Sequence, residues 1–208
     1  MIVFDVDGVV LDLESRVLDV VEELEGRRPQ RLNGNYRFGP RFGLSDEAVA
    51  RLWRRFEARG LWGDLNPYPG AAEVLRAVQA LGLPIAFVTG IDPADRALRA
   101  ANLERLGIRD FGLYCTGSAF APKGPMLTRL GARAFVDDRL RHLSDAAAIV
   151  EHLAWIDQGE DQDIAHDEVP GANRHASLAE WLEAHHDWLE AVARRVGSAR
   201  PACRSRGG

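Results

Sequence analysis

The sequence predicts an α/β protein, with a doubly wound, Rossmann-like parallel sheet and a small helical segment inserted after the first strand. From residue 69 onward, short apolar runs alternate with longer runs of helical periodicity, which is typical of parallel sheets. A further apolar run lies at residues 2–4. Residues 27–68 show turn-rich and helical patterns but no convincing strand, which favours a helical insertion over a long structureless loop.

Five short apolar runs are the expected strands. The first is Ile-Val-Phe and stops at the polar turn that begins with Asp5. In chain order the runs cover residues 2–4, 84–88, 111–115, 134–136 and 152–156. Gly, Pro or Asp bounds most of them, as is usual for strands that run into turns.

Apolar residues at helical spacing predict the helices, and glycines such as Gly26, Gly82 and Gly107 mark several of their ends. The expected helices cover residues 9–24, a stretch that begins after the candidate N-cap Ser45, and residues 70–81, 92–106, 125–130, 140–150 and 177–195. Residues 158–175 are rich in Asp, Gln, Gly and His and are expected to form a loop.

The domain organisation follows from these elements. We expect an α/β core at residues 1–11 and 69–195, a helical insertion at 12–68 and a flexible tail at 196–208. No internal repeat is visible.

Composition narrows the function classes. Of the 208 residues, 46% are hydrophobic and 27% are charged, an ordinary balance for a globular protein. A net charge of −5 argues against a nucleic acid polymer as partner. Two cysteines provide no disulfide framework, and no apolar run reaches the ~18 residues of a membrane span. We therefore expect a cytoplasmic protein without a membrane partner; nothing in the sequence predicts its oligomeric state.

Polar side chains follow three of the predicted strands. Asp5 and Asp7 come after the first strand, Thr89 after the second, and Asp137 and Asp138 after a later one. In open parallel sheets, ligands bind at the carboxyl ends of the strands, near the point where the strand order reverses. These residues are therefore expected to share one site.

Their chemistry suits phosphate transfer. Mg²⁺ prefers oxygen ligands, which Asp5 and Asp137 can supply from different strands. A carboxylate such as Asp5 can attack phosphorus, and Asp7 can protonate the leaving oxygen and then activate water. Thr89 and Lys123, the only lysine of the chain, can hold the phosphoryl oxygens. Taken alone, Thr89 would be an ordinary strand-end residue and Lys123 a surface lysine.

Four sequence pieces resemble the haloacid dehalogenase superfamily of phosphatases, and they occur in that family's order. They are Phe4-Asp5-Val6-Asp7-Gly8-Val9-Val10, Phe87-Val88-Thr89-Gly90, Lys123, and Phe135-Val136-Asp137-Asp138. They span most of the expected core and lie at or near predicted strand ends.

The resemblance implies a role for each of these positions. Asp5 would be the nucleophile and Asp7 the acid–base residue. Thr89, Gly90 and Lys123 would bind phosphate. Asp5, the backbone carbonyl of Asp7 and Asp137 would hold Mg²⁺, with Asp138 as a further metal-shell carboxylate or a partner of Lys123. The helical insertion would be a mobile cap.

Within the superfamily, Asp137-Asp138-Arg139 and the stretch Pro67-Tyr68-Pro69-Gly70-Ala71 are similar to the deoxyribonucleotidase-like branch. The expected activity is Mg²⁺-dependent hydrolysis of a phosphomonoester through an aspartyl-phosphate. The substrate would be a small phosphorylated metabolite, with a nucleotide as one candidate. A phosphomutase, a haloacid dehalogenase and a catalytically silent binding protein remain as alternatives.

Two groups of side chains stay open to different interpretations. The six histidines show no zinc-ligand spacing and are expected to be structural or exposed. Four residues in turn-rich parts of the insertion are candidates either for reading the leaving group or for packing: Tyr36, Arg37, Arg41 and Trp62.

Overall fold

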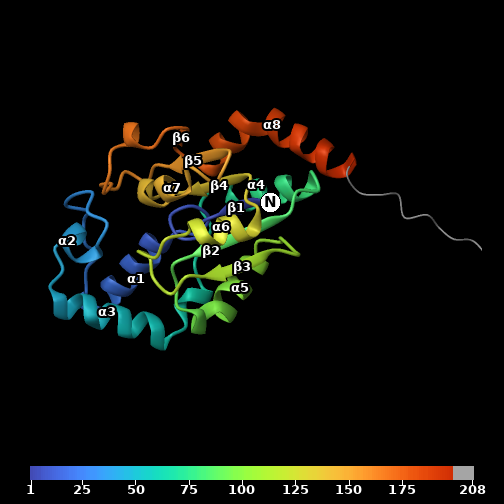
Figure 1. Ribbon diagram of the computed structural model, residues 1–208. Helices are drawn as coiled ribbons and strands as arrows, with labels where there is room; N and C mark the ends of the chain where they lie inside the picture. The colour runs from blue at the N-terminus through green and yellow to red at the C-terminus, as the bar shows by residue number, and fades with distance from the viewer. Residues whose placement is uncertain (199–208) are drawn as a thin grey trace, which may run out of the picture.

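The computed structural model describes residues 1–198, and its centre is a six-stranded sheet in which every strand pair is parallel (Figure 1). The strand order is β3-β2-β1-β4-β5-β6. The strands are β1 Ile2–Phe4, β2 Ile85–Thr89, β3 Gly112–Cys115, β4 Ala134–Asp137, β5 His152–Ile156 and β6 Ala172–His175. This confirms the predicted fold class and the five predicted strands.

The sixth strand corrects the prediction of a loop over residues 158–175. Ala172–His175 pairs with β5 at the edge of the sheet. Its two middle residues, Asn173 and Arg174, are exposed, whereas Ala172 and His175 are buried. A four-residue edge strand with polar side chains has no apolar alternation that would distinguish it from a loop, and only its ladder with β5 identifies it.

Helices cover both faces of the sheet. They are α1 Leu13–Glu25, α2 Phe38–Phe42, α3 Asp46–Ala58, α4 Ala71–Ala80, α5 Arg96–Glu104, α6 Gly124–Leu130, α7 Leu140–Ala146 and α8 Leu178–Ser198, with 3₁₀ turns η1 Leu61–Gly63, η2 Pro93–Asp95 and η3 His166–Glu168. Helices α4, α5 and α8 share one apolar core with Phe4 and Phe87. Helices α6 and α7 pack on the opposite face with Val3 and Phe135. The sheet is therefore doubly wound.

The first helix begins later than predicted, at Leu13 instead of residue 9. The carbonyl of Val6 accepts hydrogen bonds from the amides of Val10 and Leu11, so a tight turn occupies the residues directly after β1. Asp12 then caps α1 by accepting a hydrogen bond from the amide of Ser15 at 2.9 Å. We call residues 5–12 the β1 turn.

Two further helices differ from the prediction: residues 92–106 form η2 followed by α5, and the helix predicted at 140–150 ends at Ala146.

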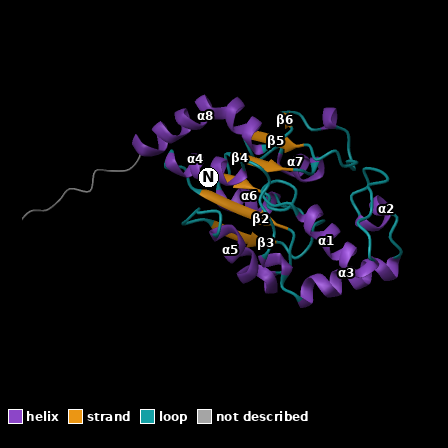
Figure 2. Ribbon diagram, turned by 180° about the vertical axis from the view of Figure 1, so that it is seen from behind, coloured by secondary structure: helices purple, strands orange, loops and turns teal. Residues whose placement is uncertain are grey.

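Helices α1, α2 and α3 lie beyond the carboxyl ends of the strands, to one side of the sheet, whereas α4 packs on the sheet itself (Figures 1 and 2). Among the described residues, no strand occurs in this part of the chain. Val17, Leu52 and Phe56 belong to the same apolar cluster as the core strands. The boundaries 12–68 remain a prediction, because the apolar packing is continuous across them.

Within residues 1–198 no helix has the length and hydropathy needed to cross a bilayer. The predicted tail at 196–208 begins inside α8, since residues 196–198 are helical. Residues 199–208 lie outside the described part of the chain.

Candidate active site

The strand order reverses next to β1. The chain runs from β1 to β2 and β3 on one side, and then returns to place β4 on the other side of β1. Asp5 directly follows β1, and Asp137 is the last residue of β4. Because these two strands are neighbours and parallel, their carboxyl ends lie side by side at the switch point. The fold thus brings the two carboxylates together.

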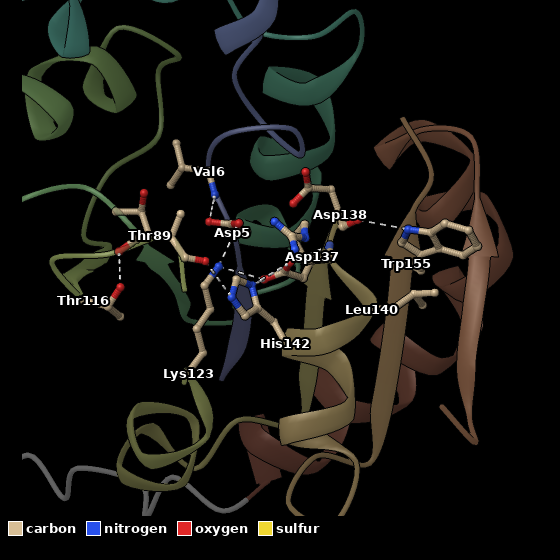
Figure 3. A network of polar contacts seen from close by, with 12 residues as sticks. Asp5, Val6, Thr89, Thr116, Lys123, Asp137, Asp138, Leu140, His142 and Trp155 are labelled. Atoms are coloured by element: carbon tan, nitrogen blue, oxygen red, sulfur yellow. Dashed lines mark hydrogen bonds and ion pairs between the residues drawn. The ribbon is translucent and has the colours of Figure 1, made fainter. Parts of the chain in front are cut away.

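Lys123 links the two carboxylates (Figure 3). Its side chain is 1% exposed, and Nζ lies 2.8 Å from Oδ2 of Asp5 and 2.8 Å from Oδ2 of Asp137. The other oxygen of Asp5 accepts a hydrogen bond from the amide of Val6 at 2.7 Å. Lys123 is the N-cap residue of α6, so the helix fixes the position of the ammonium between the two strands.

The electrostatics of these groups are strongly coupled. Burial raises the pKa of Asp5 to about 6, against the opposing effect of Lys123. Burial also opposes ionisation of Asp137, but Lys123 and His142 outweigh it and lower the pKa of Asp137. Burial alone would lower the pKa of Lys123, yet the two carboxylates raise it. Lys123 is therefore a permanent cation here.

His142, on α7, belongs to this cluster, although the spacing of the histidines in the sequence did not predict a metal site. Its Nδ1 lies 3.2 Å from both carboxylate oxygens of Asp137, and Nε2 lies 3.1 Å from the carbonyl oxygen of Ala119. The amide of Arg139 also donates to Asp137, at 2.8 Å. His142 is placed by the helix that follows β4, and no motif marks that position.

Asp138 lies against the β1 turn. A Cβ added to Gly8 would come within 2.3 Å of Oδ2 of Asp138, so only glycine leaves room for this carboxylate. Burial, followed by the charges of Asp137 and Asp5, raises the pKa of Asp138 well above its ordinary value. The backbone carbonyl of Asp138 accepts hydrogen bonds from Trp155 and Gln162, which fixes the residue.

The donor set fits a hard cation. Asp5, Asp137 and His142 place one ligand atom each within 4.8 Å of one another, the one such group in residues 1–198. The ring nitrogens of His142 face Asp137 and Ala119, so the candidate ligands are the carboxylate oxygens of Asp5 and Asp137, the ligand type that Mg²⁺ prefers. Asp138 adds a buried acidic group beside them. Asp7, the other predicted metal residue, directs its carboxylate elsewhere.

Asp7 pairs with Arg99 of α5. One guanidinium nitrogen, Nη2, lies 2.7 Å from Oδ1 and 3.0 Å from Oδ2 of Asp7. The Asp7 side chain is 20% exposed and lines the cavity described below. Burial raises the pKa of Asp7 despite the opposing charge of Arg99. The sequence analysis did not identify Arg99.

Thr89 is the last residue of β2, and Gly90 follows it beside the same site. The Thr89 side chain is buried, and its hydroxyl forms no well-shaped hydrogen bond within the described residues, although it helps to lower the pKa of Asp7. A Cβ on Gly90 would lie 2.7 Å from Cα of Ala119, so glycine permits this close approach. The Thr89 hydroxyl therefore has hydrogen-bonding capacity that the described residues leave largely unused.

A cavity of about 870 Å³ opens over these groups, between the core and the insertion. Asp5, Asp7, Gly90 and Lys123 line its floor. Aromatic side chains from the insertion and from the core line it as well: Tyr36, Phe38, Trp53, Trp62, Tyr68 and Phe120. The space is larger than a phosphate group requires, which leaves room for the rest of an ester.

The segment 157–163, which we call the acidic loop, joins the insertion to the β1 turn. Arg41 of α2 is buried and forms ion pairs with Glu14 and, at 2.6 Å, with Glu160. Gln158 donates a hydrogen bond to the carbonyl of Gly8 at 2.7 Å. Three further contacts are Arg31 to the Gly159 carbonyl, the Asp161 amide to the Gly34 carbonyl, and Arg139 to Asp163, each at 2.6 Å.

These contacts decide some of the interpretations left open for the insertion. Arg41 also lines the cavity, but it is buried and paired with Glu14 and Glu160, which favours a packing role. Tyr36 lies under the guanidinium of Arg139, with its ring centroid 3.7 Å from Cζ, and also borders the cavity. Trp62 has the guanidinium of Arg99 at 5.3 Å and also borders the cavity. Arg37 is exposed at the cavity rim.

Comparisons with known proteins agree on the fold. A family model described as haloacid dehalogenase-like hydrolase matches residues 1–140. A hydrolase of that family from Deinococcus radiodurans R1, solved with bound phosphate and sodium, superposes with a TM-score of 0.61 at 20% identity, covering 90% of this chain and 96% of that one. No curated protein matches the sequence.

Two other similar structures carry names that state different reactions, one a dehalogenation and the other a phosphate hydrolysis. An L-2-haloacid dehalogenase has a TM-score of 0.61 at 18% identity, covering 89% of this chain and 97% of that one. A predicted phosphoglycolate phosphatase from Haemophilus somnus 129pt has a TM-score of 0.58 at 14% identity, covering 88% and 96%. At such identities the likeness concerns the fold, and the reaction has to be argued from the site.

Proposed function

The chain belongs to the haloacid dehalogenase-like hydrolases, and from that membership we propose that it is a Mg²⁺-dependent phosphomonoester hydrolase with Asp5 as nucleophile. The observation that carries the proposal is the second carboxylate. Asp7 faces the same cavity as Asp5 and Lys123, where a leaving oxygen could be protonated. Displacement of a halide from carbon has no such oxygen, so Asp7 favours phosphate esters over haloacids.

In the first step a carboxylate oxygen of Asp5 attacks phosphorus, and the bond to the ester oxygen breaks. Asp7 gives its proton to that oxygen as the alcohol leaves. Lys123 and the hydroxyl of Thr89, with the backbone amide of Gly90 beside it, hold the phosphoryl oxygens. The aspartyl-phosphate is then hydrolysed: Asp7 takes a proton from water, the water oxygen bonds to phosphorus, and Asp5 is released.

Mg²⁺ would be held by Asp5, Asp137 and the backbone carbonyl of Asp7, with Asp138 beside it, and would offset the repulsion between carboxylate and phosphate. The pKa of about 6 for Asp5 supports this assignment, because a nearby cation favours the ionised form that attacks phosphorus.

The proposed substrate is a small phosphorylated metabolite. The aromatic lining and the size of the cavity favour an ester whose alcohol part carries a planar group, and a nucleotide meets that description. The insertion would act as the cap that encloses it, with the acidic loop holding the insertion over the site.

The test is Mg²⁺-dependent release of phosphate from 4-nitrophenyl phosphate, followed by a screen of nucleotides, sugar phosphates and phospho-acids. Asp5→Asn should fold and should lose turnover, because an amide cannot act as the nucleophile. Asp145→Asn, the same chemical change on an exposed part of α7, is the matched control and should keep full activity.

Phosphate release by Asp5→Asn would disprove the mechanism. Halide release from 2-haloacids without phosphatase activity would establish the dehalogenase, and interconversion of sugar phosphates would establish the mutase.

A further inference from the structure

Arg99 of α5 is a buried cation that faces Asp7. Its side chain is 0% exposed. The only hydrogen bonds of its guanidinium go to Asp7, and within the described residues Nε and Nη1 have no partner. A buried guanidinium with two unused donors is a poor source of stability, because the lost hydration is only partly replaced. Its position therefore needs another explanation.

The helix that carries Arg99 is firmly attached at the end of the insertion. Asn102 exchanges two hydrogen bonds with the backbone of Leu65, at 2.7 and 2.9 Å. Arg105 donates to the carbonyl of Gly63 at 2.7 Å. Trp62 of η1 lies over the guanidinium of Arg99, with 5.3 Å between Cζ and the ring centroid. Arg99 is consequently held on a rigid support beside Asp7.

Two cations compete for the Asp7 carboxylate. Arg99 binds it directly, and Lys123 also attracts it across the site. Lys123 already joins Asp5 to Asp137, so a carboxylate drawn towards it would crowd the nucleophile and the phosphate-binding groups. Because Nη2 holds both oxygens of Asp7, the carboxyl group stays on the Trp62 side of the cavity.

We propose that Arg99 is a positioning residue that holds the Asp7 carboxyl on the leaving-group side of the site. This inference rests on the proposed function, in which Asp7 protonates the leaving oxygen. It acts through Asp7 and touches neither the substrate nor the metal. Removing Arg99 should impair the expulsion of poor leaving groups far more than that of good ones.

The experiment compares two probes of similar shape, phenyl phosphate and 4-nitrophenyl phosphate. Phenolate needs protonation as it leaves, since phenols titrate near the tyrosine value of about 10, whereas 4-nitrophenolate is a much better leaving group. The variants are Arg99→Met and Arg99→Lys, with Arg96→Met as control. Arg96 is an exposed arginine of the same helix and donates to the carbonyl of Leu113.

We expect Arg99→Met to lower kcat/KM for phenyl phosphate by about 10- to 100-fold, which is part of the rate enhancement that a general acid contributes. For 4-nitrophenyl phosphate we expect a loss of about threefold or less, because that leaving group needs little protonation. Arg99→Lys should recover most of the loss, and Arg96→Met should match the wild type. Equal losses with both probes, or no loss with either, would overturn the proposal, because a merely structural role cannot distinguish the leaving groups.

A crystal structure of Arg99→Met provides a readout without turnover. The Asp7 carboxyl is expected to move towards Lys123, and an unmoved carboxyl would refute the positioning role. Wild-type protein inactive towards both probes would instead count against the proposed function. The two failures can therefore be told apart.

Discussion

Replacing Lys123 by methionine should destabilise the metal-free protein strongly. The ammonium lies 2.8 Å from each of two buried carboxylates. At an effective dielectric constant of about 20, each contact represents about 6 kcal/mol of attraction. Burying the ammonium costs several kcal/mol, so the net loss expected from removing the shared partner is about 3–5 kcal/mol in the free energy of unfolding.

For a chain of this size, that loss corresponds to a decrease in Tm of roughly 6–20 °C. Thermal unfolding at pH 7 in the presence of a chelator measures it. Arg133→Met is the control, because Arg133 forms an exposed ion pair with Glu151 at 2.7 Å, and such pairs contribute at most about 1 kcal/mol. Mg²⁺ should restore part of the stability of Lys123→Met by placing another cation between Asp5 and Asp137.

A Tm for Lys123→Met within about 2 °C of that of Arg133→Met would refute the reasoning. It would mean that the carboxylates around Lys123 are not ionised together in the metal-free protein. The coupled charges described for the site would then be wrong, and with them the electrostatic reason for a metal.

Two further predictions concern the same carboxylates. Without metal, the pKa of Asp5 is about 6 in the folded protein, compared with 3.8 in the unfolded chain. Between about pH 4 and 6 the folded state therefore binds more protons than the unfolded state. The free energy of unfolding should consequently fall by about 3 kcal/mol as the pH rises through that window. The raised pKa of Asp138 changes the free energy of unfolding in the same direction, whereas Asp137, whose pKa is lowered, loses its stabilising contribution only below about pH 4. Urea unfolding in the presence of a chelator measures this pH dependence. A free energy of unfolding that does not change with pH would contradict the prediction. Gly8→Ala should lower the Mg²⁺ affinity about tenfold or more, because the new Cβ would meet Asp138 at 2.3 Å. Gly26→Ala is the control, because Gly26 has a similar positive φ but no atom lies within 4 Å of the new Cβ. Calorimetric titration with Mg²⁺ should show an unchanged affinity for this control.

The sequence predicted those parts of the site that lie at strand ends. Asp5 and Asp137 were predictable because parallel strands bring their carboxyl ends to one edge. Lys123 was predictable because it is the only lysine and lies in a Pro-flanked loop that leads into a helix upstream of Asp137. These inferences need only the order of the elements.

The residues that the sequence did not reveal depend on how helices and loops pack. Arg99 and His142 point into the site from helices whose rotation about their axes is set by tertiary contacts, and neither lies in a motif. The edge strand Ala172–His175 carries too few apolar side chains to show alternation. Glu160 belongs to a loop whose partner Arg41 is 119 positions away, a relation that local patterns cannot express.

The hydrogen bond between Gln158 and the carbonyl of Gly8 can form only late in the synthesis of the chain. It joins groups 150 positions apart. At about 5–20 residues per second, the ribosome needs roughly 8 to 30 s to make the intervening chain. During that time the β1 turn exists without the acidic loop that supports it, and the insertion emerges with Arg41 still lacking Glu160. A nascent chain that stops before β5 would therefore carry Asp5, Asp7 and Lys123 but would lack the brace that holds the insertion above them.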